Sequence, residues 1–531
     1  MMELNNFQKQ VVEVLGAQSP LFMVGGAVRD HFLGENTKDV DLVSYLEPER
    51  ISALLKEKGY RPLEMGKGFQ TISVFEEENR IDIVSIKNLE QDAGRRDFTI
   101  NALYMNPSSG EILDPLKGLE DLKQKILRAC GLAGERFSED PVRILRMVKL
   151  AVKFGLDIEE HTFEEAREKV PLLANVPKER VTSELAEILV LEKAEKAVRM
   201  LLELGYWEIF IPELSRLKGL EQNRYHSLDV WEHTLAVFRS TPADLFLRLA
   251  GLFHDLGKWE TASRECYLRG SLNYDGQNYW IGEFKIVGTR GKTELENKLK
   301  PSVGKKISIL GSRLDHYPEI VQFKRILNSP IEEGISYVPG GKRHFLNHEK
   351  SSAVLLAKVL KKYSFDMFFK GAGKKRERDL LHLVENHMQG TLTFMPELNG
   401  KPLTRSFKER AAELVWKIGW DGRDFELQRV HDFLVLWKAD YYAGKVHDEE
   451  QEKVFDKIFS VLIKTALWQH ENLPKLDWQE FYRFAALQNL EKEQLGDFKD
   501  WVRFQALLKR QLKPDFPFLQ KIFNQYQVSR K

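Results

Sequence analysis

Residues 21–45, LFMVGGAVRDHFLGENTKDVDLVSY, constrain the fold of this chain more than any other stretch. The apolar run Leu21–Val24 predicts a strand, and Gly25 and Gly26 follow it at the point where a short helix is expected to begin. Glycines at a strand-to-helix turn leave backbone N–H groups accessible, and a helix N-terminus favours anions. The stretch therefore predicts an α/β domain with a turn that binds phosphate.

A pair of acidic residues follows on the next predicted strand. Asp39 and Asp41 are two positions apart, so their side chains should project from the same face of that strand. Neighbouring carboxylates repel each other unless a cation lies between them, and their oxygens suit a divalent metal. Asp82, in the alternating run at residues 80–86, either joins this pair as a third catalytic carboxylate or faces solvent, and both interpretations stay open.

The motif GGAVRD followed by DVDL resembles the class II tRNA nucleotidyltransferase and bacterial poly(A) polymerase family, within the larger DNA polymerase beta superfamily. The stretch GRRDFTINAL, residues 94–103, is similar to the RRDxxxNA element with which this family contacts the incoming nucleotide. The resemblance implies transfer of nucleotides from CTP or ATP to the acceptor end of tRNA, with Mg²⁺ held by Asp39 and Asp41. The resemblance also implies that Gly25, Gly26, Arg29 and Arg96 bind the nucleotide.

The stretch SEDPVRILRMVKLAVKFGL predicts a helix that Ser138 caps, with a buried apolar stripe at positions 142, 145, 148 and 152. Asp140, Arg143 and Arg146 step by three and should share another face, where an ion pair on a wet surface is the plain alternative. In the family this face reads the base, because an Asp accepts from the amine of C or A and an Arg donates to the neighbouring ring acceptor. Arg146 would reach the triphosphate, and Lys149 stands where relatives usually carry a further Arg.

A second group of motifs starts near residue 225. YHSLDVWEHTL and LAGLFHDLGKW contain His233 and the adjacent pair His254 and Asp255, and His348, His387 and Asp440 follow on later predicted helices. Imidazoles and carboxylates that converge from several helices suit one or two divalent cations.

This ordered set resembles the HD phosphohydrolase superfamily, which implies a metal such as Mg²⁺, Mn²⁺ or Ni²⁺ and a metal-activated water that attacks a phosphate. Lys258 is close enough in sequence to steady the anion, and His226 is an additional candidate ligand. Relatives with this domain hydrolyse terminal 2′,3′-cyclic phosphates, 2′-nucleotides or phosphomonoesters. A relic fold kept for tRNA binding is the alternative.

The product of the first module stays open. Only the short link KNLEQDAG, residues 87–94, stands where CCA-adding relatives generally have a longer flexible loop, and CC-adding relatives characteristically have it shortened. Full CCA addition and CC-only addition are therefore both retained. A poly(A) polymerase and an RNA-binding HD protein with an inactive head are the further alternatives.

The predicted fold class is α+β, with a mixed α/β head, an all-α neck and body, an α-helical HD domain with an insertion, and a helical tail. The expected boundaries are 1–130, 131–215, 216–445 with the insertion at 259–342, and 446–531. Residues from about 160 to 215 predict a continuous amphipathic helix. The strand-like runs in the insertion fit a small embedded subdomain touching RNA or solvated decoration, and the basic, aromatic tail fits RNA binding or packing.

Composition excludes several other classes of protein. Basic and acidic residues number 80 and 79, so RNA binding must come from local surface rather than from net charge. Two distant cysteines, Cys130 and Cys266, exclude a disulfide framework and a cysteine zinc site. The polar N-terminus and the lack of a long apolar run predict a cytoplasmic protein without membrane segments. The sequence leaves the oligomeric state open.

Overall fold

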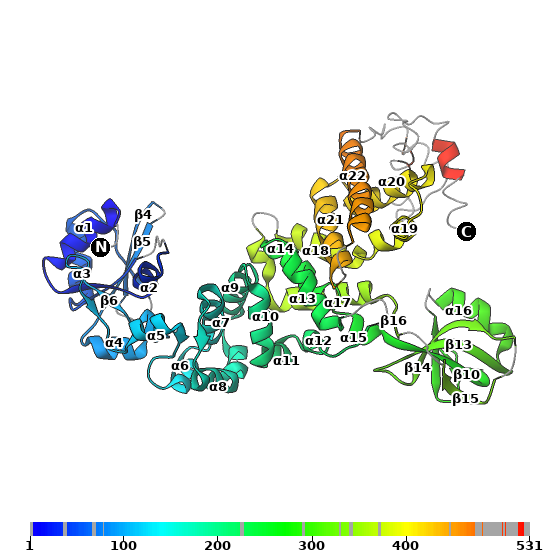
Figure 1. The fold of residues 1–531 in the computed structure, drawn as a ribbon, viewed down its shortest axis with the longest axis horizontal. Helices are drawn as coiled ribbons and strands as arrows, with labels where there is room; N and C mark the ends of the chain where they lie inside the picture. The colour runs from blue at the N-terminus through cyan, green and yellow to red at the C-terminus, as the bar shows by residue number, and fades with distance from the viewer. Residues whose placement is uncertain are drawn as a thin grey trace. The chain divides into compact units, whose positions relative to one another are not determined.

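The computed structural model describes residues 4–35, 40–65, 71–77, 79–222, 228–288, 292–328, 331–338, 343–369, 373–444 and 448–472, together with 481, 502, 505 and 519–524. The chain divides into two compact units, Met1–Phe210 and Ile211–Lys531. The first unit begins with a mixed β-sheet and the helices packed on it. Helices dominate the remainder of the chain apart from one inserted β domain (Figure 1). This confirms the predicted α+β class. None of the described helices combines the length and the hydrophobicity that crossing a membrane requires.

A seven-stranded sheet with the order β3-β4-β5-β2-β1-β6-β7 begins the first unit. The predicted strand is β1 (Leu21–Val24), and the helix after the glycines is α2 (Gly26–Leu33). β2 runs antiparallel to β1 and parallel to β5, so it lies in the middle of the sheet. The other strands are β2 (Val40–Ser44), β3 (Leu63–Met65), β4 (Thr71–Glu76), β5 (Asn79–Ser85), β6 (Tyr104–Met105) and β7 (Ile112–Leu113).

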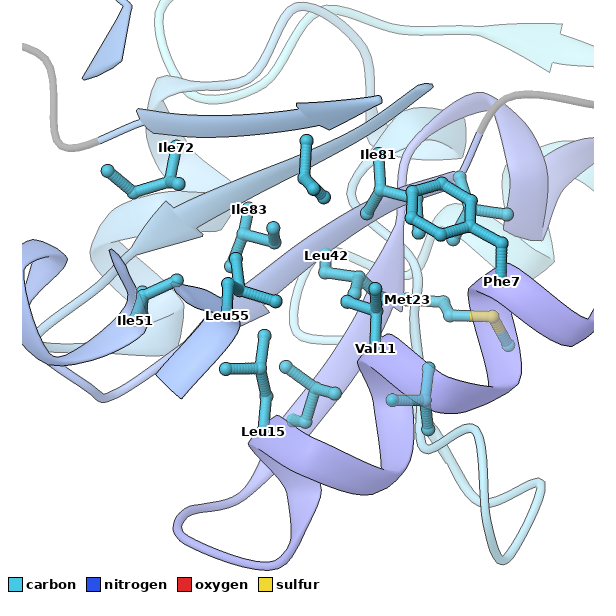
Figure 2. Close-up of a cluster of buried hydrophobic side chains, with 14 of the residues drawn as sticks. Phe7, Val11, Leu15, Met23, Leu42, Ile51, Leu55, Ile72, Ile81 and Ile83 are labelled. Atoms are coloured by element: carbon cyan, nitrogen blue, oxygen red, sulfur yellow. The ribbon is translucent and has the colours of Figure 1, made fainter. Parts of the chain in front are cut away.

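Helices α1 (Asn6–Gly16) and α3 (Pro48–Glu57) cover one face of this sheet with apolar side chains. Figure 2 shows Phe7, Val11 and Leu15 of α1, with Ile51 and Leu55 of α3, against Met23, Leu42, Ile72, Ile81 and Ile83 of the strands. A second buried cluster, which includes Val43, occupies the opposite face. Asp41 is two residues before Val43 on β2, so its side chain belongs to that opposite face.

Short helices and two-residue strands complete the first unit. The predicted continuous helix from about 160 to 215 is wrong, because prolines at 171, 177 and 212 interrupt it where they remove backbone donors. The elements are α4 (Leu89–Arg95), η1 (Thr99–Asn101), α5 (Gly118–Gln124), β8 (Ile126–Leu127), α6 (Ala133–Glu139), α7 (Val142–Phe154), β9 (Asp157–Ile158), α8 (Glu160–Lys169), η2 (Val170–Asn175), α9 (Lys178–Leu189), α10 (Ala194–Glu203) and α11 (Tyr206–Phe210).

The helix that carries the predicted base-reading residues begins later than expected. α7 starts at Val142, and Ser138 lies inside α6, where its hydroxyl donates to the carbonyl of Gly134 at 2.6 Å. The predicted Ser138 cap is therefore wrong. Asp140 is extended, with φ −144° and ψ 93°, so it does not share a helix face with Arg143 and Arg146. The predicted stripe at 142, 145, 148 and 152 is buried, as expected.

Helices form most of the second unit. α13, α14, α17, α18 and α21 pack against one another, and the histidines and aspartates predicted for the second module lie at or near their ends. The helices are α12 (Pro212–Ser215), α13 (Val230–Ser240), α14 (Leu245–Phe253), α15 (Lys258–Thr261), α17 (His348–Tyr363), η4 (Phe365–Phe368), α18 (Gly373–Asn386), α19 (Gln389–Leu398), α20 (Arg405–Gly419), α21 (Leu427–Tyr442) and α22 (Glu449–Glu471).

A β domain interrupts these helices between α15 and α17. The strand-like runs predicted in the insertion form strands, and their buried side chains make a core of their own. The elements are β10 (Ala262–Tyr274), β11 (Tyr279–Ile281), β12 (Phe284–Gly288), α16 (Lys292–Leu299), η3 (Lys300–Ser302), β13 (Lys306–Leu314), β14 (Ile320–Ile326), β15 (Gly334–Tyr337) and β16 (Arg343–Phe345).

Candidate functional site

A pocket of about 840 Å³ lies beside the Gly25-Gly26 turn in the first unit. Seven basic side chains line it against four acidic ones, so its surface favours an anion. Eight of the predicted residues contribute to the lining, whereas the lining does not include Asp82 or Asp140. The eight are Gly25, Gly26, Arg29, Asp41, Arg96, Arg143, Arg146 and Lys149.

The geometry of the turn requires glycine at position 25. Its φ is +79°, a backbone conformation that side chains disfavour. A Cβ at this position would lie 3.3 Å from Asp41 Oδ2 and 3.8 Å from Arg96 Nη1. Gly25 therefore brings the backbone, one carboxylate and one guanidinium together at one corner of the pocket.

The predicted carboxylates differ in their surroundings. Asp41 is exposed and is the register partner of Asp82 on the parallel strand β5. Asp82 accepts hydrogen bonds from Ser73 Oγ at 2.6 Å and Arg80 Nε at 2.8 Å, so a role as a third metal ligand would require these contacts to change. Asp39 lies outside the described residues.

Arg29 is held in place at the wall of the pocket. Its Nε and Nη2 donate to Asp30 Oδ1 at 2.8 and 2.6 Å, and its Nη1 donates to Asn101 Oδ1 at 2.6 Å. The residue is only 7% exposed, so these hydrogen bonds satisfy a guanidinium that burial would otherwise penalise. Arg29 thereby ties α2 to η1.

Asp92 of α4 is not among the residues predicted from the sequence, although its carboxylate organises the two arginines of the RRD motif. It accepts from Arg95 Nη2 at 2.7 Å, from Arg96 Nε at 2.9 Å and from Tyr104 Oη at 2.7 Å. Burial acts to raise the pKa of Asp92, but the charge of Arg96 and these hydrogen bonds outweigh it and lower the pKa. The i, i+4 spacing of Asp92 and Arg96 is the sequence signal that could have revealed the pair.

The predicted base-reading residues lie close together without pairing with each other. Arg143 Nη2 donates to the carbonyl of Arg95 at 2.9 Å, which attaches α7 to the end of α4. Asp140 Oδ2 accepts from Arg180 Nη2 at 2.8 Å. Each side chain is therefore already oriented by another element, and Asp140 stands outside the pocket lining.

Two further cations line the pocket beyond Arg143. Arg146 Nη2 lies 2.8 Å from Asp97 Oδ2, and Lys149 Nζ lies 2.9 Å from Glu187 Oε2. Lys149 Nζ also lies 2.5 Å from Glu184 Oε2, and Lys153 lines the pocket beside these two residues. The wall formed by α7 is therefore predominantly basic.

The second unit contains a buried cluster of histidines and aspartates, and it brings together all six of the residues predicted there. Two sets of three ligand atoms lie within 4.8 Å of one another, His233 with His254 and Asp255, and Asp255 with His348 and His387. Asp440 completes the cluster, with Oδ1 3.0 Å from His233 Nε2 and 3.7 Å from His254 Nε2. His226 lies outside the described residues.

Three of the imidazoles are oriented by backbone carbonyls. His254 Nδ1 lies 2.9 Å from Gly251 O, His348 Nδ1 lies 2.8 Å from Phe345 O, and His387 Nδ1 lies 2.7 Å from Val384 O. With metal bound, a proton on each Nδ1 would leave the Nε2 lone pair directed at the centre of the cluster. This is the second hydrogen bond that metal-binding histidines almost always make.

Electrostatics at the cluster also fit a cation. Burial acts to raise the pKa of Asp255, but His254 and Lys258 outweigh it and hold the pKa well below its usual range. Burial and the neighbouring His254 and His348 lower the pKa of His387 to about 3, so this imidazole is neutral, as a metal ligand must be. Both carboxylate oxygens of Asp255 are buried without an aligned hydrogen-bond donor, although Lys258 Nζ is 2.7 Å from Oδ2. A divalent cation would satisfy them.

Comparison with family models supports the assignment of the first unit. Residues 21–88 and 82–128 match the model described as the Poly A polymerase head domain. Residues 155–218 match the model described as the probable RNA and SrmB-binding site of polymerase A.

Two curated relatives are identical to this chain at about a third of the positions in the matched segments. The CC-adding tRNA nucleotidyltransferase of Thermus thermophilus is 36% identical over 252 residues, 45% of this chain and 56% of that protein. The multifunctional CCA protein of Alkalilimnicola ehrlichii is 35% identical over 274 residues, 46% of this chain and 64% of that protein. The matched part of the chain thus spans between about half and two thirds of the length of these relatives.

A solved structure, the CCA-adding enzyme of Bacillus stearothermophilus in complex with CTP, is similar in fold with a TM-score of 0.52. The two share 14% identity, and the match covers 99% of each chain, so it speaks for the fold alone. Residues 21–128 and 155–218 are thus similar to the head and RNA-binding domains of poly(A) polymerases.

Proposed function

We propose that this protein adds C, A or both from CTP and ATP to the 3′ acceptor end of tRNA. The observation that carries the proposal is the pocket at the Gly25-Gly26 turn, where the Asp41 carboxylate faces a wall of basic side chains. This pocket combines a carboxylate for a metal with cations for a triphosphate. The names of the two sequence relatives point to the same reaction.

Asp41 fits the role of a metal ligand, because its exposed carboxylate lines the pocket. It lies next to Gly25, which has no side chain to block access. With Asp39 it would hold Mg²⁺, which lowers the pKa of an attacking hydroxyl and neutralises charge on a leaving pyrophosphate. The chain itself supplies Arg96, Arg146 and Lys149 to bind and orient the triphosphate. The 3′-hydroxyl of the RNA attacks the α-phosphorus and a P–O bond forms. The bond from that phosphorus to the oxygen bridging to the β-phosphate breaks, pyrophosphate leaves, and the hydroxyl proton passes to water.

Base selection is assigned to Asp140 and Arg143. An Asp acceptor and an Arg donor together match the amine and ring acceptor of cytosine or adenine, whereas uracil would place a carbonyl against the carboxylate. Arg143 lines the pocket, and Asp140 would turn from Arg180 toward the base. This choice needs no nucleic-acid template.

The nucleotides that the protein adds are identified by sequencing the 3′ ends of its tRNA products. Purified protein is given a tRNA that lacks its last three nucleotides, with CTP, ATP or both, and the products are sequenced. Two C residues and a stop would identify a CC-adding enzyme, C-C-A the complete enzyme, and a long A tract a poly(A) polymerase. Asp41→Asn should abolish incorporation, whereas Asp157→Asn, an exposed carboxylate of β9, should leave it unchanged. Incorporation by Asp41→Asn at the normal rate would contradict the proposal.

We further propose that the buried cluster makes the second unit a metal-dependent phosphohydrolase. Its support is the convergence of four imidazoles and two carboxylates with Lys258 beside them. His233, His254, Asp255, His348, His387 and Asp440 would hold one or two cations, which supply an activated water. Lys258 is buried and lies next to Asp255, so it is in a position to bind the phosphate of the substrate.

The hydrolase is tested with metal-stripped protein. Mg²⁺, Mn²⁺ or Ni²⁺ is returned in turn, and hydrolysis of a 2′,3′-cyclic nucleotide, a 2′-nucleotide and a phosphomonoester is measured. Activity that returns with one metal and is absent in Asp255→Asn supports the proposal. Metal binding without any hydrolysis would instead favour a structural site.

A further inference from the structure

Five of the seven strands of the β domain in the second unit close into a ring. β10 pairs with β11, β11 with β12, β12 with β14, β14 with β13, and β13 with β10. Only the pairing of β12 with β14 is parallel. In chain order this is a five-stranded barrel with the sequence 1-2-3-5-4-1, and α16 lies between its third and fourth strands. That topology is the OB barrel, a fold used by many proteins to bind oligonucleotides or oligosaccharides.

Glycines allow the barrel to close tightly. A Cβ on Gly270 would lie 2.7 Å from Ile281 Cγ2, and a Cβ on Gly311 would lie 2.6 Å from Val321 Cγ1. Gly311 follows an irregularity in the register between β13 and β14, where a β-bulge increases curvature. The sequence of the insertion thus specifies a closed barrel rather than a flat sheet. A fold alone does not define a ligand, because function depends on the side chains that the fold presents.

One row of side chains crosses four neighbouring strands on the outside of the barrel. Asn273 of β10 is the register partner of Trp280, Trp280 of Lys285, and Lys285 of Ile320. Their sequence neighbours Tyr279, Ile281 and Ile286 are buried in the barrel core, so the row itself points outward. Trp280 and Lys285 therefore stand side by side on the outer face of β11 and β12.

The two central members of the row suit a nucleic-acid strand. Trp280 Nε1 donates to Asp275 Oδ2 at 2.7 Å in the β10–β11 turn, which fixes the orientation of the indole. In the described part of the chain Lys285 has no acidic partner, so its ammonium remains available to a phosphate. An aromatic platform next to a cation is the combination that single-stranded nucleic acids require.

Charge distinguishes the barrel from the rest of the chain. Residues 262–345 contain 14 lysines and arginines and nine acidic residues, a net charge of +5, whereas the whole chain carries +1. The residues outside the barrel therefore sum to −4. A basic module on an otherwise slightly acidic protein favours a polyanion over a protein partner of mixed charge.

The barrel is also connected directly to the histidine cluster. It is inserted between Asp255 and His348, and Lys258 contacts both Asp255, at 2.7 Å, and the ring of Phe345 in β16, at 5.5 Å. At the β13–β14 turn the ring of His316 stacks on Trp259, with centroids 3.9 Å apart. Ile320, the last member of the outer row, immediately follows this turn. A nucleic-acid strand bound along this row of side chains would therefore end near the segment that carries Lys258.

We propose that the inserted barrel is a binding site for single-stranded RNA, with a base stacked on Trp280 and a phosphate held by Lys285. The site is distinct from the nucleotide pocket of the first unit and does not require that pocket to be active. Binding is measured without nucleoside triphosphates, so failure of the transferase proposal would leave this one intact.

The test uses the full-length chain and a fluorescein-labelled, eight-nucleotide single-stranded RNA in a fluorescence anisotropy titration. Trp280→Ala should weaken binding about 5- to 100-fold, the range expected for loss of one stacked base, and Trp280→Phe should restore most of it. Lys285→Gln should reduce the slope of log K against log salt by about 0.7, the value for one phosphate contact on a single strand. Lys358→Gln, an exposed lysine of α17, is the matched control and should leave the slope unchanged.

A second measurement locates the bound strand. RNA containing 4-thiouridine is cross-linked by light, and the attached peptides are identified by mass spectrometry. Cross-links within residues 273–287 are expected. The proposal is overturned if the wild-type chain does not bind the RNA, if both barrel variants bind like wild type, or if every cross-link falls outside the barrel. Variants that retain the metal content and circular dichroism of wild type exclude misfolding as the cause of weaker binding.

Discussion

His348 Nε2 and His387 Nε2 lie 3.3 Å apart, although the two histidines are 39 residues apart in the chain. Both rings are fixed from behind, by the carbonyls of Phe345 and Val384, and both point at Asp255. With Asp255 they form a set of three ligand atoms that lie within 4.8 Å of one another, which is the clearest structural reason to expect a metal at this cluster.

Replacing either of these histidines should weaken metal binding. Loss of a group that only supports a ligand typically costs about 10- to 100-fold in affinity, so His348→Ala or His387→Ala should lose at least about 100-fold. Metal content after dialysis, measured by mass spectrometry, and the dissociation constant for Mn²⁺ check this. His431→Ala is the control, since that side chain is 65% exposed on α21 and outside the cluster. Equal metal retention in all three variants would exclude the cluster as the binding site.

Metal should also stabilise the second unit. Ligand at about 100 times its dissociation constant stabilises a folded protein by about 2.7 kcal/mol, which corresponds to a rise of roughly 4 °C in the unfolding temperature of a unit as large as Ile211–Lys531. Differential scanning calorimetry with and without Mn²⁺ or Ni²⁺ measures the shift. Asp255→Asn removes the carboxylate shared by both ligand sets and should abolish the response, whereas Asp424→Asn, an exposed residue, should keep it. A metal-dependent shift that persists in Asp255→Asn would contradict the assignment.

Strands, turns and short motifs could be predicted from the sequence, because each depends on residues that are close together in the chain. The apolar run before Gly25 predicts β1, and the histidines of the second module fall on motifs whose spacing is readable without a structure. The division into four parts and the roles of individual site residues stay predictions. The extended conformation of Asp140 was missed even though Pro141 follows it, and a residue before proline is pushed out of the helical region.

Other features could not be read because they depend on long-range pairing. Strand-like runs in the insertion were visible, but the order in which β10 to β14 close depends on contacts between distant segments. Asp92 was missed for a related reason. Its spacing to Arg96 is local, yet its importance comes from Tyr104, which reaches it from β6, and from the burial of all three groups. Only the folded sheet shows that this carboxylate orients an arginine of the pocket.

Asp140→Ala should relax the choice of nucleotide. A buried carbonyl of uracil facing a carboxylate acceptor costs about 1–3 kcal/mol, so removing the acceptor should reduce discrimination between CTP and UTP by about 10- to 100-fold. Single-nucleotide incorporation with each triphosphate gives the ratio of kcat/KM values. Arg167→Ala, which breaks only an exposed pair with Glu164, is the control. Unchanged discrimination in Asp140→Ala would assign base selection to other residues.

Asp92→Asn tests the network behind the pocket. The carboxylate is 2% exposed and pairs with Arg96 at 2.8 Å, and removal of one partner from a buried ion pair costs about 3–5 kcal/mol.

The folded-state pKa of Asp92 is lowered, so its contribution to stability is fully present above the ordinary pKa of an aspartate, about 3.9, and is lost as the pH falls through the lower folded-state value. The difference in unfolding free energy between wild type and Asp92→Asn should therefore be constant from pH 5 to 7 and shrink in acid below about pH 4. Urea unfolding of the first unit, followed at several pH values, measures this. Because Arg96 lines the pocket, KM for CTP should rise as well. Asp121→Asn, which breaks the pair between the buried Asp121 and the partly exposed Arg128 outside the pocket, should lower stability without that change in KM. A pH-independent difference would mean that Asp92 does not act through its charge.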